Sequence, residues 1–415
     1  MNPAVKFQTI NGWEASLPSS LTSASAMTEA QWSSLLDLAV NEMGVNRLRL
    51  DVASGTEGPN GTGYAIVNDN ADPNVIDPAG FNWTTLDQRI DRVILPWRQR
   101  VLARQETPYI NLQYVDKANS SFEHYANPQE YAEFMVAVFQ HLRTKYGFVP
   151  DAIEVIHQPN EVTGWRTPAN IANVILATAA RLQAAGFGVP DFIGPSTSTA
   201  GAASTFIDQI NAVPAAMALV KEIGYHRSGG TTALPNDISN IALRGTQLGK
   251  RTAMLEYRAD PAAPTSGPNY AMLHEDLSVG RSSVWQQGVL ADKNSCVGQW
   301  TRLNNGAAEL CPTSKLTRQY TKYVRPGASR VQATGNSTFE PLAFVNADGR
   351  HVVVVKAATG GAISISGLPP GVYGVYSTES GGANVTTNWS NVTVAPGQPV
   401  SARIPSAGVI TVYKR

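Results

Sequence analysis

The amino-acid sequence predicts an α/β fold, a (β/α)8 TIM barrel with a C-terminal antiparallel β-sandwich domain. Up to about residue 320, short β-branched or apolar runs alternate with amphipathic stretches at helical spacing, which is typical of repeated βα units and a parallel sheet. Beyond Tyr323 the helical spacing disappears, and short runs rich in Val, Thr and Gly follow about ten residues apart, as in antiparallel sandwiches. We therefore expect the barrel over 9–320 and the sandwich over 321–415, and we leave open whether residues 1–8 join the sandwich.

Eight candidate strands appear along the first part of the chain, as a barrel of this kind requires. Each is a short apolar run, and helical spacing of apolar residues separates one run from the next. The expected barrel strands are 9–15, 45–52, 108–114, 152–157, 191–194, 218–226, 251–257 and 282–286, and the expected helices are 29–42, 87–103, 128–146, 169–185, 203–211, 238–248 and 269–279. The long stretch 54–80, rich in Gly, Asn and Pro, is expected to be a functional loop, because loops above about 12–15 residues are otherwise uncommon.

The expected sandwich strands are 339–346, 351–357, 361–366, 371–377, 391–395, 400–404 and 408–413. Asp348-Gly349 lies between the first two of these runs and is typical of a type I′ hairpin turn.

Charge and composition exclude several classes of partner. Only 15% of the 415 residues are charged, and 32 Lys and Arg balance 32 Asp and Glu, so no electrostatic field favours nucleic acid or an acidic membrane surface. No apolar run reaches the roughly 18 residues that a membrane-spanning helix needs, and residues 1–8 lack the features of a signal peptide. We expect a secreted or extracellular monomer whose signal peptide is absent from this chain.

Cys296 and Cys311 are the two cysteines of the chain, and a loop-like stretch separates them. A disulfide closing a loop of about 15 residues would stabilise the fold by about 3 kcal/mol in the chain-entropy treatment, and it suits an oxidising compartment. Two unpaired thiols are the alternative. A zinc site would need further Cys or His close by, and His274 is the nearest.

Two glutamates follow expected barrel strands at the end where the active sites of this fold form. Glu161 comes after the run 152–157, and Glu256 lies near the end of the run 251–257. Hydrolysis of a glycosidic bond with retention needs one carboxyl group to protonate the leaving oxygen and another, about 5–5.5 Å away, to attack the anomeric carbon. The two glutamates are therefore the candidate catalytic pair.

An Asn-Glu dipeptide after the fourth strand and a Glu at the end of the seventh resemble the pattern of the retaining glycoside hydrolases of clan A. The matching residues are Asn160-Glu161 and Glu256. The resemblance implies that Asn160 binds the sugar 2-hydroxyl, that Glu161 is the acid/base and that Glu256 is the nucleophile. It covers residues 9–290.

The same resemblance assigns further residues to substrate binding. It places Arg49 at the end of the second strand, although Arg49 could instead pair with Asp51 or Glu154 inside the barrel. It also places His226 or Tyr225 after the sixth strand, and only one of these neighbours is expected to line the site. It further implies that Trp285, at the end of the eighth strand, forms the floor of a sugar subsite.

Four more residues are candidates for the pocket. The aromatic faces of Trp13 and Trp165 suit stacking on pyranose rings, and packing inside the barrel is the alternative. His157 lies close to Glu161 in the sequence and either lines the pocket or is a core histidine. Tyr257 either donates a hydrogen bond to Glu256 or packs.

Within clan A, the segment 323–331 (YVRPGASRV) and the strands that follow it resemble glycoside hydrolase family 30, in which a β-sandwich is joined to the barrel. Two features depart from that family: Val162 stands where the family has Pro, and Asn11-Gly12-Trp13-Glu14 replaces its Gly-Gly-Phe-Gly opening. A clan A exo-glycosidase of another family, glucuronidase-like or family 39-like, is therefore the alternative.

The sequence thus predicts a retaining glycosidase acting on an oligo- or polysaccharide with β-linked sugars. A metal-dependent hydrolase lacks support, because the six histidines are scattered with no metal-binding spacing, so neither a metal nor another cofactor is expected. A sugar-binding protein without catalysis is a further alternative, against which both carboxylates argue.

Overall fold

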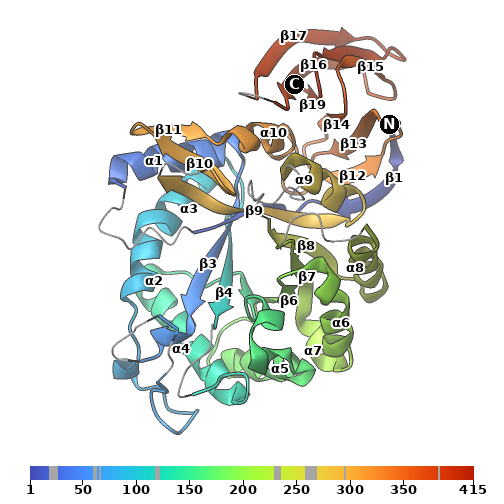
Figure 1. Cartoon of the computed structure of the whole chain (residues 1–415). Coiled ribbons are helices and arrows are strands. Elements are labelled where there is room, and N and C mark those ends of the chain that lie inside the picture. Colours follow the sequence, from blue (N-terminus) through green and yellow to red (C-terminus); the bar gives the residue numbers. More distant parts are fainter. Residues whose placement is uncertain are drawn as a thin grey trace.

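The structure is a computed structural model that describes the chain except residues 18–26, 59–62, 65–66, 117–121, 229–234, 258–268, 294–295 and 382–383. Eight parallel strands form a closed barrel, since the last pairs with both the first and the seventh. They are β2 Gly12–Ser16, β3 Arg47–Ala53, β4 Tyr109–Val115, β5 Ala152–Glu154, β6 Asp191–Thr197, β7 Val220–His226, β8 Arg251–Glu256 and β9 Ser282–Lys293. The predicted barrel is confirmed (Figure 1).

Helices surround the barrel strands (Figure 1). They are α1 Glu29–Asp37, α2 Thr84–Arg89, α3 Leu95–Ala103, α4 Pro128–Tyr146, α5 Pro168–Ala184, α6 Ala200–Asn211, α7 Pro214–Leu219, α8 Pro235–Leu248, α9 Asn269–Ser278 and α10 Pro312–Thr321. Two π-helical turns, Leu38–Glu42 and Ile90–Ile94, interrupt the predicted helices 29–42 and 87–103. The bounds of α4 match the prediction because its ends are marked locally: Pro128 fits the first helical position, and Gly147 ends the helix with φ 71°.

The lumen of the barrel holds an ionic layer near the amino ends of the strands. The guanidinium of Arg47 donates to both carboxylate oxygens of Glu222, at 3.0 and 2.9 Å, and its Nε donates to Glu14 at 2.9 Å. All three side chains are fully buried. Such an arrangement is stable because each buried charge has a partner with good hydrogen-bond geometry.

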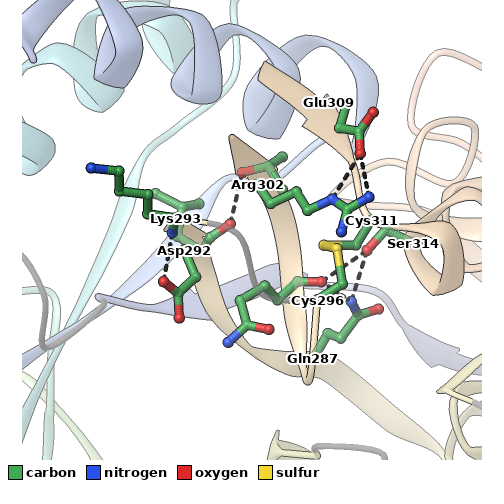
Figure 2. Close-up of a disulfide and its surroundings, with 11 residues drawn as sticks. Gln287, Asp292, Lys293, Cys296, Arg302, Glu309, Cys311 and Ser314 are labelled. Atoms are coloured by element: carbon green, nitrogen blue, oxygen red, sulfur yellow. Dashed lines mark hydrogen bonds and ion pairs between the residues drawn. A yellow bond between two sulfur atoms is a disulfide. The ribbon is translucent and has the colours of Figure 1, made fainter. Parts of the chain in front are cut away.

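Strand β9 is longer than the predicted run 282–286 and continues into an extension of the barrel sheet. Its second half pairs with β10 Gln299–Asn304, which forms a hairpin with β11 Ala307–Leu310. The predicted disulfide between Cys296 and Cys311 is present, with a Cα–Cα distance of 5.4 Å. Figure 2 shows it beside Gln287 and Ser314, whose side chains share a hydrogen bond of 2.8 Å.

The C-terminal part forms antiparallel sheets. A seven-stranded sheet has the order β1-β12-β13-β14-β19-β16-β17, and β15 pairs with β18 in a separate sheet. These strands are β1 Asn2–Thr9, β12 Ser329–Gln332, β13 Phe339–Val345, β14 His351–Ala357, β15 Gly361–Ile365, β16 Gly371–Glu379, β17 Thr386–Val394, β18 Val400–Ile404 and β19 Gly408–Lys414. Strand β1 lies beside β12 although more than 300 residues separate them (Figure 1). The N-terminal residues thus belong to the sheet formed by the end of the chain.

The barrel and this sheet share packed contacts. The Trp13 ring nitrogen donates to the carbonyl of Val324 at 2.8 Å, and the Gln319 carbonyl accepts from the hydroxyl of Thr411 at 2.7 Å. Arg325 forms an ion pair with Glu106. One hydrophobic cluster includes buried residues of both parts, so the domain boundary at residue 321 remains a prediction. None of the helices in the described part of the chain has the length and apolar character that a membrane crossing requires.

Candidate active site

The two candidate glutamates lie at the carboxyl ends of barrel strands. Glu256 is the last residue of β8, and Glu161 belongs to the 3-10 turn Pro159–Glu161 that follows β5. These are the seventh and fourth strands of the barrel in chain order. Both glutamates therefore lie at the end of the barrel where the active sites of this fold form.

Glu256 is held by a buried arginine. Nη2 of Arg49 lies 2.6 Å from Oε2 of Glu256, and Nη1 donates to the carbonyl of Leu255 at 3.2 Å. The side chains of Arg49 and Glu256 are 3% and 13% exposed. Burial alone would lower the pKa of Arg49, but the carboxylates of Glu256 and Asp51 hold it above its ordinary value. Arg49 thus stays a cation and favours the ionised form of the carboxylate it contacts.

Glu161 has a different environment, which is exposed and contains uncharged hydrogen-bond donors. Its Oε1 accepts from the hydroxyl of Ser198 at 2.5 Å and from Nδ2 of Asn160 at 2.8 Å. Oδ1 of Asn160 in turn accepts from the backbone N–H of Ser198 at 2.8 Å. Asn160 and Ser198 therefore fix the orientation of one carboxylate oxygen and leave the other side of Glu161 open to solvent.

Ser198 was not among the residues identified from the sequence. It follows β6 directly, at the same end of the barrel as the two glutamates. The rule that functional side chains lie after the strand ends would have included it, but a single serine carries no motif that distinguishes it from other loop serines.

Two histidines lie close to Glu256. One side-chain ligand atom each of His157, His226 and Glu256 lies within 4.8 Å of the others, and the two imidazole rings are 5.3 Å apart. Burial, followed by the positive charges of Arg49 and His226, lowers the pKa of His157 to about 3. His157 is therefore neutral near pH 7. Of the two neighbours predicted as alternatives, Tyr225 and His226, it is His226 that lies beside Glu256.

This group also offers the nitrogen and oxygen donors that zinc accepts. Arg49, however, already forms an ion pair with Glu256 at 2.6 Å. Because a fixed positive charge next to a ligand opposes binding of a cation, we do not propose a metal at this position.

Glu154 of β5 lies in the lumen of the barrel, beneath the candidate site. Its side chain is fully buried and accepts hydrogen bonds from the amides of Asn111 and Gln113. Burial would raise the pKa of Glu154, but the hydrogen bond from His226 and the charge of Arg49 lower it to about 2. Glu154 is thus a permanent anion beneath the candidate site. The sequence analysis considered it only as an alternative partner for Arg49.

Trp285 and Tyr225 do not line the candidate site. Both are fully buried, and both donate to the carboxylate of Asp276 on α9, at 2.9 Å from the indole nitrogen and 2.8 Å from the phenol oxygen. Their side chains therefore point from the barrel towards a surrounding helix. Trp285 has no exposed face on which a sugar could stack, so it is not part of the site that we propose.

Trp13, Trp165 and Tyr257 are also fully buried. Trp13 bonds to the backbone of Val324, and the indole nitrogen of Trp165 lies 3.1 Å from the carboxylate of Asp116. The placement of Trp13 and Trp165 matches the packing alternative that the sequence left open, and the role of Tyr257 stays a prediction. The structure therefore brings together Arg49, His157, His226 and Glu256, and it places Asn160 and Glu161 at the same end of the barrel.

Solved structures share this fold. The catalytic domain of GH30 xylanase C from Talaromyces cellulolyticus matches with a TM-score of 0.74 and 19% identity over 99% of this chain and 98% of that chain. The endo-beta1,6-glucanase BT3312 matches with a TM-score of 0.70 and 15% identity over 100% and 93%. The GH39 enzyme from Xanthomonas axonopodis pv. citri matches with a TM-score of 0.57 and 12% identity over 100% and 94%.

No protein-family model matches the sequence, and a search of curated proteins finds no relative. At these identities the similarities to solved structures show the fold. The predicted resemblance to clan A, and within it to family 30, is confirmed at that level.

Proposed function

We propose that this protein is a retaining glycoside hydrolase of the family 30 type that cleaves β-linked glycosides or polysaccharides by double displacement. The observation that carries the proposal is the contrast between two carboxyl groups at the same end of one barrel. Glu256 forms an ion pair with buried Arg49, whereas Glu161 is exposed and bonded by uncharged donors. A nucleophilic carboxylate and a separate acid/base carboxyl group are the two components that retention requires.

In the proposed first step, the Glu256 carboxylate attacks the anomeric carbon, and the bond from that carbon to the leaving oxygen breaks. Glu161 gives its proton to this oxygen, so the aglycone leaves neutral. In the second step, Glu161 removes a proton from water, whose oxygen attacks the anomeric carbon and releases Glu256. The product has the anomeric configuration of the substrate because two inversions have taken place.

Three neighbouring residues complete the proposed site. Asn160 is fixed by Ser198 next to the acid/base, and it is the residue proposed to bind the sugar 2-hydroxyl. His157, neutral near pH 7, and His226 lie beside the nucleophile and offer ring nitrogens for hydrogen bonds to sugar hydroxyl groups.

The substrate is proposed to be an oligo- or polysaccharide of β-linked sugars, handled outside the cell. Two solved structures that share this fold are described as a xylanase and an endo-β1,6-glucanase, and the disulfide suits an oxidising compartment.

Hydrolysis of xylan, β-glucans, galactans and glucuronide-bearing glycans tests the proposal, with NMR used to assign the first-formed anomer. We expect the first-formed product to keep the β configuration. Glu256→Ala and Glu161→Ala should lose activity, while Glu29→Ala, at a side chain 75% exposed on α1, should retain it. A first product of inverted configuration would reject the double displacement, and no hydrolysis of these glycans or of aryl β-glycosides would favour a sugar-binding protein.

A further inference from the structure

A second group of carboxylates lies away from the proposed catalytic pair. Asp69 belongs to the segment between β3 and α2, and Glu130 and Glu133 lie on the first two turns of α4. One carboxylate oxygen from each lies within 4.8 Å of the others. Two elements distant in sequence thus bring three acidic groups to one point.

Glu133 is the decisive member of this group. Its side chain is fully buried, and apart from the carboxyl group of Glu130 beside it, neither carboxylate oxygen has a hydrogen-bond partner in the described part of the chain. Oε2 of Glu130, a residue only 7% exposed, and Oδ1 of Asn68 are likewise buried without a partner there. The cation recorded beside Glu133 is Arg181, whose Nη2 is 3.8 Å away. A buried carboxylate without hydrogen bonds is costly, so this arrangement calls for a positive group between the oxygens.

We propose that Asp69, Glu130 and Glu133 bind a divalent cation, Ca²⁺, that fastens the segment after β3 to the start of α4. Carboxylate and amide oxygens are the ligands of hard cations, and Ca²⁺ accepts 6–8 of them in flexible geometry. The three carboxylates supply part of such a shell, which water completes. Zinc would require nitrogen or sulfur ligands, and Mg²⁺ demands a stricter octahedron.

The surroundings hold Asp69 in place for this role. Oδ2 of Asp69 accepts from the backbone N–H of Asp77 at 2.6 Å, and Oδ1 accepts from that of Asn70 at 2.8 Å. A Cβ on Gly80 would lie 2.3 Å from Cβ of Asp69, so only glycine permits this close approach. The segment is thus folded around the carboxylate before any cation arrives.

The cation would act on the rim of the barrel, because the segment follows β3 and α4 follows β4. Its role is structural and does not depend on the proposed glycosidase activity. The spacing of histidine and cysteine residues predicts no metal site, and carboxylates from two distant elements leave no such spacing in the sequence.

A shared proton is the competing explanation. Burial, followed by the neighbouring Glu130, raises the pKa of Glu133 to about 9, so without a cation the two glutamates would retain a proton at neutral pH. The two explanations differ in their response to calcium.

Calorimetric titration of the EGTA-treated, desalted full chain with CaCl2 tests the proposal, together with thermal unfolding in CaCl2 and in EGTA. We expect one bound Ca²⁺ per chain and a Tm higher by roughly 2–5 °C at saturating calcium. No binding heat and equal Tm values in the two buffers would overturn the proposal in favour of the shared proton. An equal response to MgCl2 would overturn the assignment to calcium.

Two variants locate the site. Glu133→Gln and Asp69→Asn should each weaken calcium binding by about tenfold or more, whereas Glu29→Gln on the surface of α1 should leave it unchanged. Because each comparison is made between CaCl2 and EGTA for the same variant, effects of the substitution on folding cancel. If Glu133→Gln fails to fold, Asp69→Asn decides, since Asp69 is partly exposed. Unchanged affinity in the folded variants would place the calcium elsewhere and overturn the proposal.

Discussion

Glu161 and Glu256 have different hydrogen-bond partners at the same end of the barrel. Arg49 forms an ion pair of 2.6 Å with Glu256, while Glu161 receives bonds from a hydroxyl and an amide. In a double displacement these two environments correspond to a nucleophile and an acid/base. Removing either carboxylate should therefore have a distinct chemical consequence.

We predict that azide distinguishes the two roles. Glu256→Ala removes the nucleophile, so added azide should restore turnover and give a glycosyl azide of inverted configuration. Glu161→Ala keeps the nucleophile, so an aryl glycoside with a good leaving group should form the intermediate in a burst, and azide should then give the retained product. Stopped-flow kinetics and product NMR measure both effects, and exchanged stereochemical outcomes would reverse the assignment.

Ser198 is predicted to position the acid/base. In Ser198→Ala, Glu161 loses a hydrogen bond of 2.5 Å to Oε1, and Asn160 loses a contact of 2.7 Å to the Ser198 hydroxyl. We expect kcat to fall by roughly tenfold, as loss of a hydrogen bond of about 1–1.5 kcal/mol implies. KM should change little, and Ser198→Thr, which keeps the hydroxyl, should recover part of the loss. A change in KM alone would indicate that Ser198 binds substrate instead.

The candidate site residues that can be predicted from the sequence are those that a local sequence signal marks. Asn160, Glu161 and Glu256 stand at strand ends within recognisable dipeptides or runs. The side that Trp285 faces depends on the pleat of its strand: Gln286 pairs with Glu14 across β2 and β9, and the neighbouring Trp285 bonds to Asp276 on α9. A shift of one residue along a strand exchanges the side chains that face the lumen with those that face outwards. Residue type alone does not determine which of the two sides a residue faces.

Among the elements, the predicted strands and helices of the barrel were recovered because their apolar spacing is strong and their ends carry caps. Thr28, for example, forms a capping box with Gln31 at the start of α1. The sequence did not predict the hairpin of β10 and β11, because the stretch between Cys296 and Cys311 was expected to be a loop. Its strands contain Arg302, Asn304 and Glu309, and polar residues of this kind obscure strand alternation.

The disulfide should stabilise this hairpin region. Cys311 is fully buried at the cap of α10 and closes a loop of 15 residues with Cys296 (Figure 2). Replacing both cysteines by serine should lower the free energy of unfolding by up to about 3 kcal/mol, measured by urea denaturation. Activity at 25 °C should be unchanged because neither cysteine contacts the Arg49–Glu256 pair. Reaction of both thiols with a labelling reagent in the native, unreduced protein would contradict the bridge.

At the scale of the whole molecule, the two ends of the chain meet in one sheet. The pairing of β1 with β12 was left open by the sequence because strand partners more than 300 residues apart leave no local trace. The interface between this sheet and the barrel, here called the seam, contains buried polar groups as well as apolar ones. Its stability should therefore respond to pH.

His274 on α9 lies in this seam. Nδ1 is 3.0 Å from the hydroxyl of Tyr320, and Nε2 is 3.9 Å from Oε2 of Glu340 on β13. Burial, followed by the positive charges of Lys356 and Arg330, lowers the pKa of His274 from 6.5 to about 3. The folded chain thus keeps His274 neutral in a pH range where the unfolded chain protonates it.

This difference predicts acid destabilisation through the seam. Between pH 6.5 and about 3 the unfolded state binds a proton that the folded state does not, so the free energy of unfolding should fall as the pH falls, by up to about 1.4 kcal/mol per pH unit. Above pH 6.5 His274 contributes no slope. In His274→Gln the residue no longer titrates, so the slope of the free energy of unfolding against pH should lose the contribution of about one bound proton. Urea unfolding from pH 7.5 to 4 measures this slope. His157, also neutral when folded, should leave part of the slope in the variant. An identical slope in His274→Gln and the parent protein would show that the seam does not exclude the proton and that acid acts elsewhere in the fold.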